Sequence, residues 1–349
     1  MLIVVILLTL FIIACALSFF DADKNKATII TYVVMAVIMV AVAGLRPIGI
    51  DNDSNNYVGY FYWGGDDTVE LSFVIISAII RKIADEPQIL FIVYALLSIP
   101  FKAYIITKLT DLWFLALAVW LSRYMILQDM TQIRVAVSTA VFLYSLLFLD
   151  NGRKDKYLLC CVVATFFHYS AIVMFPLVFI GNKELSKKWI IALYALPVIG
   201  YMFSSLHINF LSLIPIPYLQ EKVEIYEMAR DEGLMGMDEI NIFNSMYLLR
   251  LALYYLLLWK YDVVKEHTKY LPVFLKIFAF SYIAYTMLSF IPVFASRISE
   301  FYGIVELLLM PLVVYTVKPE WVAKCFLILV FAYITYLDLF KNELLNLSF

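Results

Sequence analysis

The chain has 349 residues, of which 64% are hydrophobic and 15% are charged, and its mean hydropathy is +0.89. These values exclude a water-soluble globular protein of this size and predict an integral membrane protein. The net charge of −2 gives no reason to expect nucleic acid as a partner.

Apolar segments long enough to cross a bilayer, roughly 20 residues each, recur from end to end. They leave no room for a soluble domain, so we expect one integral membrane domain over residues 1–349. The predicted fold is an all-α polytopic membrane protein with about 10 to 12 transmembrane helices, including a re-entrant or short-helix pair. The expected spans are 2–20, 27–44, 88–107, 111–127, 133–149, 189–203, 243–260, 271–291, 298–317 and 321–340.

The first long polar segment follows the second span. Residues 45–70 carry five carboxylates and one arginine, far more polar groups than a simple connection between two helices needs. Conspicuous polar loops on a rigid scaffold often bind substrate. We therefore predict a first external loop over residues 45–87, in which the short apolar stretch 70–83 forms an interfacial helix.

Residues 157–182 contain a histidine and a proline inside an apolar stretch. About 26 residues suffice for two short helices, each roughly 20 Å long, which would enter and leave by the same side. The turn between them would fall at residues 166–170. Irregular backbone at that depth needs protein or a water-filled cavity around it, so His168 is predicted to mark a cavity.

The basic residues cluster between other spans, and short cytoplasmic loops are enriched in such residues. Placing these clusters inside leaves residues 204–242 outside, as a second large external loop. That segment carries seven acidic and two basic residues, unlike any of the basic loops.

With this topology, ionisable and polar residues from separate segments meet on the external side. Charges near the membrane cost several kcal/mol unless they are paired or solvated, so they are candidates for function. Arg134 could instead extend to the interface, and Arg297 with Glu300 could form a plain intrahelical pair. The candidates are Arg46, Asp51, Asp53, Tyr57, Gln128, Asp129, Gln132, Arg134, His168, Arg250, Arg297 and Glu300.

Several arginines around one polar cavity favour an anionic ligand, because guanidinium matches phosphate oxygens in a bidentate manner. The carboxylates and the histidine supply candidate bases. No nucleotide-binding loop and no metal-ligand spacing occurs in the sequence, so we expect neither a cofactor nor a metal site.

Ordered motifs resemble those of the EpsG-type, Wzy-like polysaccharide polymerases. Gly44-Leu45-Arg46 and Asp53-Ser54-Asn55-Asn56-Tyr57 resemble the family's "GxR…GTDxxNY" signature, although Asp51-Asn52 stand where Gly-Thr is usual. Glu70 follows that loop. The segments 130–136, 167–170 and 297–302 resemble the family's "IRQxxA", "FHxS" and "RxxxYF" motifs, with Val135 in place of the Gln expected after the arginine.

This resemblance implies an enzyme of the bacterial cytoplasmic (inner) membrane with a GT-C-like architecture and an active site facing the periplasm or exterior. It would join oligosaccharide repeat units carried on undecaprenyl diphosphate, as donor and acceptor, into an O-antigen, capsule or exopolysaccharide. A flippase and a chain-length regulator are the further protein partners that it implies.

In this mechanism a hydroxyl of the acceptor attacks the anomeric carbon of the donor, and undecaprenyl diphosphate leaves with inversion. Asp53 is the first candidate base and His168 the second, and Asp51 could compete with Asp53. Arg134, Arg297, Arg250 and Arg46 would bind the diphosphate. Tyr57, Glu70, Gln132 and Glu300 would bind substrate. A lipid-linked oligosaccharide flippase, an O-antigen ligase and a membrane O-acyltransferase stay open as alternatives.

Overall fold

The computed structural model of the chain describes residues 1–21, 24–64, 69–150, 152–206 and 239–347, with isolated residues between 206 and 239. Helices dominate this part of the chain. It contains no β-strand beyond one isolated antiparallel bridge between Asp51 and Leu345. The all-α prediction is therefore confirmed for the described residues.

The chain divides into two compact units, which are described separately here. The first comprises Met1–Gly181 and Glu306–Phe349, and the second comprises Asn182–Val305. The expectation of one membrane domain over the whole chain stays a prediction.

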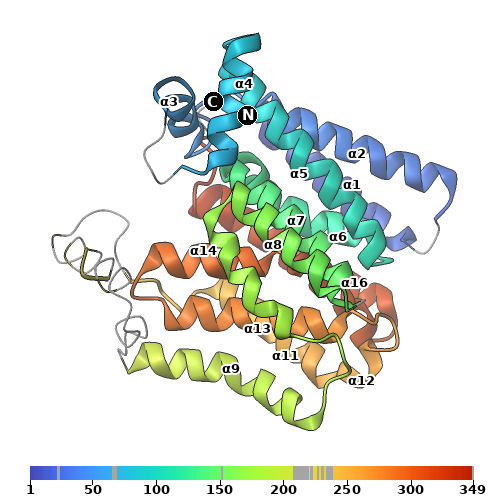
Figure 1. Cartoon of the computed structure of the whole chain (residues 1–349). Coiled ribbons are helices and arrows are strands. Elements are labelled where there is room, and N and C mark those ends of the chain that lie inside the picture. The colour runs from blue at the N-terminus through green and yellow to red at the C-terminus, as the bar shows by residue number, and fades with distance from the viewer. Residues whose placement is uncertain are drawn as a thin grey trace. The chain divides into compact units, whose positions relative to one another are not determined.

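The first unit holds most of the helices (Figure 1). Two of its segments, η2 and η6, are π-helices, and η1, η3 and η5 are 3₁₀-helices. In chain order they are α1 (Leu2–Leu17), η1 (Ser18–Phe20), α2 (Lys26–Gly44), α3 (Ser54–Trp63), α4 (Leu71–Ile83), α5 (Pro87–Leu109), α6 (Trp113–Val119), η2 (Trp120–Thr131), α7 (Ile133–Asp150), α8 (Lys154–Phe167), η3 (Tyr169–Phe179), α15 (Glu306–Leu309), η5 (Met310–Thr316), α16 (Glu320–Tyr336) and η6 (Leu337–Lys341).

Four of the described helices of the second unit begin at polar caps or at proline. The side chains of Ser186 and Asn244 accept hydrogen bonds from the first turns of two of them, and Pro272 and Pro292 stand at the start of two others. These helices are α9 (Lys187–Ser205), α11 (Ser245–Trp259), α12 (Tyr261–Val264), α13 (Leu271–Met287) and α14 (Pro292–Gly303).

Six helical segments among the described residues are long and apolar enough to cross a membrane. They are 2–20, 26–44, 88–109, 187–205, 292–316 and 320–341, and shorter apolar helices cover 133–149, 169–179, 245–259 and 271–287. A multi-pass membrane protein is therefore supported. The total of 10 to 12 crossings and the GT-C-like type stay predictions.

Close packing of α2 on α5 sets the start of the first polar loop. Gly44 ends α2, and a Cβ atom built there would stand 3.0 Å from the Cα atom of Ile92. Glycine is therefore needed for this approach, since a side chain would force the backbones apart. Gln88 at the start of α5 then donates to the carbonyl oxygens of Gly44 and Arg46, at 2.6 and 3.2 Å.

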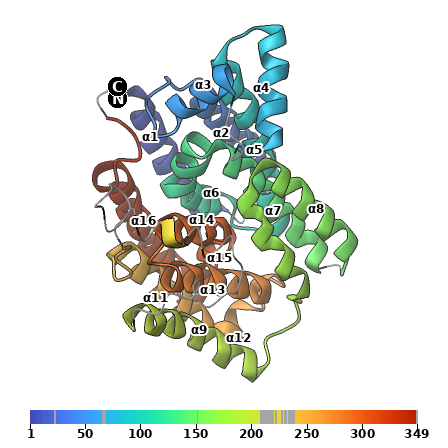
Figure 2. The same ribbon diagram turned by 60° about the vertical axis from the view of Figure 1, so that its left-hand side comes forward.

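Figure 2 shows α7 and α8 packed side by side further along the same unit.

Two expected short elements occur where the sequence predicts them. Residues 70–83 correspond to α4, and residues 157–182 cover most of α8, which begins three residues earlier, and all of η3, with an extended residue between them at His168. By contrast, α14 begins at Pro292 rather than near residue 298, so Arg297 lies inside a helix and not at its start. Most of the expected external loop 204–242 lies outside the described residues, and α9 continues to Ser205.

Candidate active site

Glu70 is the junction of three segments that are far apart in the sequence. Its Oε2 atom pairs with Nη1 of Arg134 on α7, and its Oε1 atom lies 2.6 Å from Nδ1 of His168. The backbone N–H of Tyr169, at the start of η3, donates to Oε1 at 3.2 Å. The carboxylate therefore binds a guanidinium, an imidazole and a free helix N–H group at once.

Local backbone geometry aims the three side chains at one another. Glu70 is the N-cap of α4, and its backbone oxygen accepts the first hydrogen bonds of that helix. Its carboxylate is thus free to reach the other helices. The π-helix η2 ends at Thr131, Gln132 caps it, and α7 starts directly afterwards, which puts Arg134 in its first turn. His168 lies at the break between α8 and η3, so its side chain leaves the chain where helical hydrogen bonding is interrupted.

Aromatic rings surround the guanidinium of Arg134. Its Cζ atom lies 5.5 Å from the ring centre of Tyr57 and 5.7 Å from that of Phe73. Arg134 also hydrogen-bonds Tyr57. These rings belong to a buried cluster from α3, α4, α5 and α7 that includes Phe61, Leu90 and Tyr94 among its members. Such packing restricts the rotamer of the arginine and favours its charged form through cation–π attraction.

The imidazole of His168 is buried, with 8% of the residue exposed. Its Nδ1 atom faces Glu70. Its Nε2 atom has no hydrogen-bond partner among the residues that the structure describes. A carboxylate on one ring nitrogen fixes the orientation of the ring and leaves the other nitrogen to exchange a proton with a ligand.

The pKa of Glu70 is lowered from its ordinary value of 4.5. Burial raises this pKa, but the contact with His168 and the charge of Arg134 outweigh burial. Because the folded state holds the charged form, Glu70 should add stability above about pH 4.5, and this contribution should disappear as the pH falls through the lowered value. We expect the difference in melting temperature between wild type and Glu70→Gln in detergent to shrink below that pH. A difference that grows on acidification would contradict this assignment.

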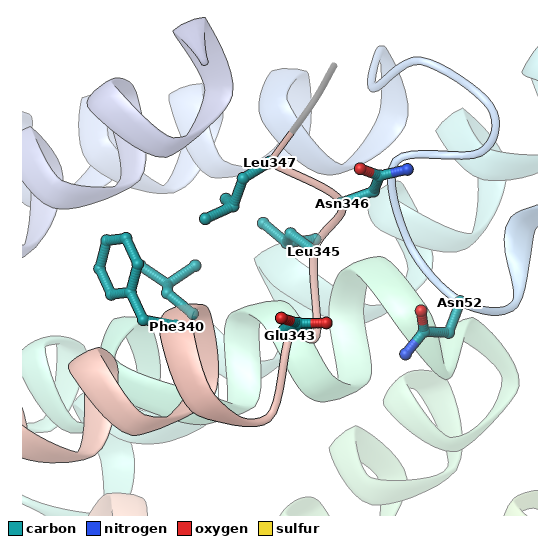
Figure 3. Close-up of a pocket in the computed structure, with 7 residues that line it drawn as sticks. Asn52, Phe340, Glu343, Leu345, Asn346 and Leu347 are labelled. Carbon is teal, nitrogen blue, oxygen red and sulfur yellow. The ribbon is translucent and has the colours of Figure 1, made fainter.

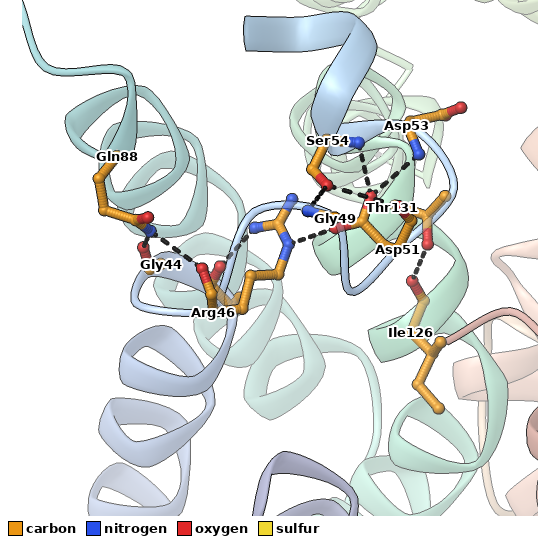
Figure 4. Close-up of polar contacts among 10 residues, drawn as sticks. Gly44, Arg46, Gly49, Asp51, Asp53, Ser54, Gln88, Ile126 and Thr131 are labelled. Atoms are coloured by element: carbon orange, nitrogen blue, oxygen red, sulfur yellow. Dashed lines mark hydrogen bonds and ion pairs between the residues drawn. The ribbon is translucent and has the colours of Figure 1, made fainter. Parts of the chain in front are cut away.

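Arg46 and Asp51 form a buried pair beneath the first loop (Figure 4). Arg46 Nε donates to Asp51 Oδ2 at 2.8 Å, and the guanidinium lies 4.3 Å from the ring centre of Phe91. Asp51 Oδ1 accepts from the backbone N–H groups of Asp53 and Ser54, at 3.1 and 2.9 Å. This pair orders the loop and caps α3.

Asp53 differs from Asp51 in its surroundings. It is the N-cap of α3, it is half-buried, and its carboxylate points away from the Arg46–Asp51 pair in Figure 4. Tyr57, one turn further along, contacts Arg134, so Asp53 stands near the site without joining its central junction.

A matched pair of variants separates these two aspartates. Asp51→Asn should lower stability by about 3–5 kcal/mol, because it leaves the buried charge of Arg46 uncompensated. Asp53→Asn should change stability little, since its carboxylate is half-exposed. Thermal unfolding of both purified variants in the same detergent measures this difference. Equal melting temperatures would show that Asp51 has no such structural role.

The remaining predicted residues belong to different surroundings. Gln132 is the C-cap of η2 and is half-buried. In the second unit, Arg250 is buried between the rings of Tyr247 and Phe278, with its Cζ atom 4.7 and 5.7 Å from their centres. Arg297 is exposed on α14, and Glu300 on the same helix is half-buried. The roles of these residues in binding stay predictions.

A second buried polar network includes Asp129, a candidate from the sequence, and Lys102, which was not singled out. Lys102 on α5 pairs with Asp129 on η2 at 3.1 Å, and both side chains are fully buried. Ser98 and Trp120 donate to the two oxygens of the same carboxylate, each at 2.7 Å. The sequence did contain a signal for this network, because Lys102 is a charged residue inside the predicted span 88–107. A charge in such a position by default marks a functional or tightly paired group.

Two further contacts connect η2 to the C-terminal part of the first unit. Arg123 donates to both oxygens of Asp338 on η6, at 2.9 and 2.8 Å, and Tyr124 donates to Glu306 at 2.7 Å. The π-helix η2 therefore makes several buried polar contacts, and it also directly precedes α7, which carries Arg134. π-Helical segments occur often at functional sites.

Among the described residues, no group of three or more His, Cys, Asp and Glu side chains is arranged to hold a metal ion.

The protein is thus a helical multi-pass membrane protein in which the buried carboxylate of Glu70 contacts the guanidinium of Arg134 and the imidazole of His168. The EpsG family model matches residues 29–347, nearly the whole chain, and the protein belongs to that family. Membership indicates a membrane protein of the polysaccharide-polymerase type that uses lipid-linked substrates. No curated protein and no solved structure gives a significant match.

Proposed function

We propose that this protein is a glycosyltransferase that polymerises oligosaccharide repeat units carried on undecaprenyl diphosphate. It would act at the external face of the bacterial cytoplasmic membrane, in the synthesis of an O-antigen, capsule or exopolysaccharide. The observation that carries the proposal is the junction at Glu70, because three residues matched to family motifs meet there in one buried cluster.

In the proposed reaction, an acceptor hydroxyl oxygen attacks the anomeric carbon of the donor. The new C–O bond forms as the bond to the diphosphate oxygen breaks, and the leaving diphosphate keeps the electron pair. Attack from the opposite face predicts inversion of the anomeric centre. The guanidinium groups would neutralise the charge that develops on the diphosphate, so the step needs no metal ion.

His168 is the base that the geometry favours, although Asp53 is the first candidate by its place in the motif. Glu70 would hold the Nδ1 side of the imidazole, and Nε2 would take the proton from the attacking hydroxyl. Asp53 and Tyr57 would then hydrogen-bond sugar hydroxyls at the edge of the site.

Arg134 is the diphosphate ligand best supported by its surroundings. Its side chain is 17% exposed, whereas that of Arg46 is 1% exposed and already paired with Asp51. Arg46 would therefore support the loop more than the ligand. Arg250 and Arg297 are proposed diphosphate ligands, and Gln132 and Glu300 substrate ligands, on the basis of the motifs alone.

A test in cells separates this proposal from the flippase alternative. Deleting the gene in its natural host should abolish long polysaccharide and leave lipid-linked single units on the external face of the membrane. A membrane-impermeant sugar-oxidising reagent reports which face they occupy. Accumulation of the units on the cytoplasmic face would identify a flippase and sink the polymerase proposal.

A further inference from the structure

A pocket of about 570 Å³ lies between the first loop and the C-terminal segment of the same unit (Figure 3). Its described lining comprises Asn52, Leu339, Phe340, Glu343, Leu345, Asn346 and Leu347. The volume is within the range of small-molecule sites, roughly 300–1,000 Å³. None of these lining residues belongs to the junction at Glu70.

The lining combines three kinds of surface. The ring of Phe340 stands on one side in Figure 3, the carboxamides of Asn52 and Asn346 stand on the other, and Glu343 lies between them. Phe340 is 54% exposed, although it is a large apolar ring. The side chains of Asn52 and Glu343 are exposed and have no polar partner within the described part of the chain.

This chemistry fits a sugar better than a phosphate. Amides and a carboxylate can exchange hydrogen bonds with several hydroxyl groups, and an aromatic ring can cover the apolar face of a sugar. A phosphate would meet the charge of Glu343 with no lysine or arginine among the seven lining residues.

The C-terminal segment that forms the pocket is held in a defined conformation. Leu345 bridges to Asp51, and the N–H of Asn346 donates to the carbonyl of Ile50 at 2.7 Å. The backbone carbonyl of Asp338 accepts from the N–H of Leu344 at 3.0 Å, and the carboxylate of Asp338 pairs with Arg123. Glu343 has φ +47°, a left-handed conformation that is uncommon for a residue other than glycine. Such backbone is retained mainly where the surroundings enforce it, often at functional sites.

We infer that this pocket is a glycan subsite, which binds a sugar residue of the acceptor repeat unit beside the first loop. The inference rests on the proposed polymerase function. Asn52 directly precedes Asp53, so a sugar in the pocket would lie next to the predicted catalytic loop, and the bridge from Asp51 to Leu345 would couple sugar binding to the position of that loop.

The test uses purified full-length protein and undecaprenyl-diphosphate repeat units from a host strain that lacks the gene. Asn52→Ala, Phe340→Ala and Glu343→Gln should each raise the concentration of units needed for half-maximal elongation about tenfold, as expected for one lost contact. The maximal rate should change little. Asn55→Ala and Phe326→Ala are matched controls, since both residues are exposed residues of the same unit that do not line the pocket.

Two readouts keep failure of the inference apart from failure of the polymerase proposal. If the wild-type protein elongates the glycan and all three pocket variants do so at the same concentration of units, the pocket is not a glycan subsite, and the proposed polymerase function is unaffected. If the wild type does not elongate, the function is wrong, and saturation-transfer NMR with the lipid-free repeat-unit oligosaccharide tests the pocket directly. Signals that persist unchanged in Asn52→Ala and Phe340→Ala would then overturn it.

Discussion

Arg134→Ala should reduce polymerisation by about 10²–10³-fold, the usual cost of removing one donor that stabilises a developing negative charge. Arg134 is the guanidinium at the Glu70 junction, and its partial exposure leaves it able to meet a ligand. Arg134→Lys should restore only part of the activity, because an ammonium keeps the charge but loses the planar fork of donors. The rate of polymer formation from purified lipid-linked units measures both effects.

Misfolding is the competing explanation, since Arg134→Ala leaves the Glu70 carboxylate without its cation. The double variant Glu70→Ala/Arg134→Ala removes both partners, and it should regain much of the lost stability while staying inactive. A double variant that is both stable and active would show that the junction has a structural role only.

His168→Ala should lower the rate by about 10²–10⁴-fold, the contribution usual for a general base. His168→Gln offers a closer replacement, because its amide can still contact Glu70 but cannot take up a proton. Added imidazole should rescue His168→Ala in part and leave His168→Gln unaffected.

His267 provides the control for this experiment, since it is exposed and lies far along the chain in the second unit. His267→Ala should behave as wild type. If His168→Gln retained full activity while Asp53→Asn lost it, the proton would be assigned to Asp53, the base that the motif favours.

Much of the helical organisation could be predicted from the sequence, because apolar length and polar interruption are local signals. The break at His168 is an example. It follows from a span that is too long for one short helix and too short for two complete crossings, with a histidine at its centre. The start of α14 was placed six residues too late, because residues 292–297 fell between two expected spans. Pro292 in fact begins the helix.

The site was harder to predict, because pairing between segments leaves no local trace. Glu70 was grouped with substrate-binding residues, and its contacts with both Arg134 and His168 came only from the structure. The sequence left Asp51 as a competitor of Asp53 for the role of base, yet Asp51 is buried in its pair with Arg46 and Asp53 is half-exposed. Lys102 lies inside an apolar span and Asp129 lies between two of them, but their pairing depends on how α5 packs against η2.

Incubation of the purified full-length protein with one defined undecaprenyl-diphosphate repeat unit tests whether the Glu70, Arg134 and His168 cluster belongs to an enzyme that joins lipid-linked repeat units. We expect a ladder with intervals of one repeat and release of one undecaprenyl diphosphate for each new linkage, both lost in His168→Gln. Intact single units with no released diphosphate, or a ladder that His168→Gln forms equally well, would contradict it.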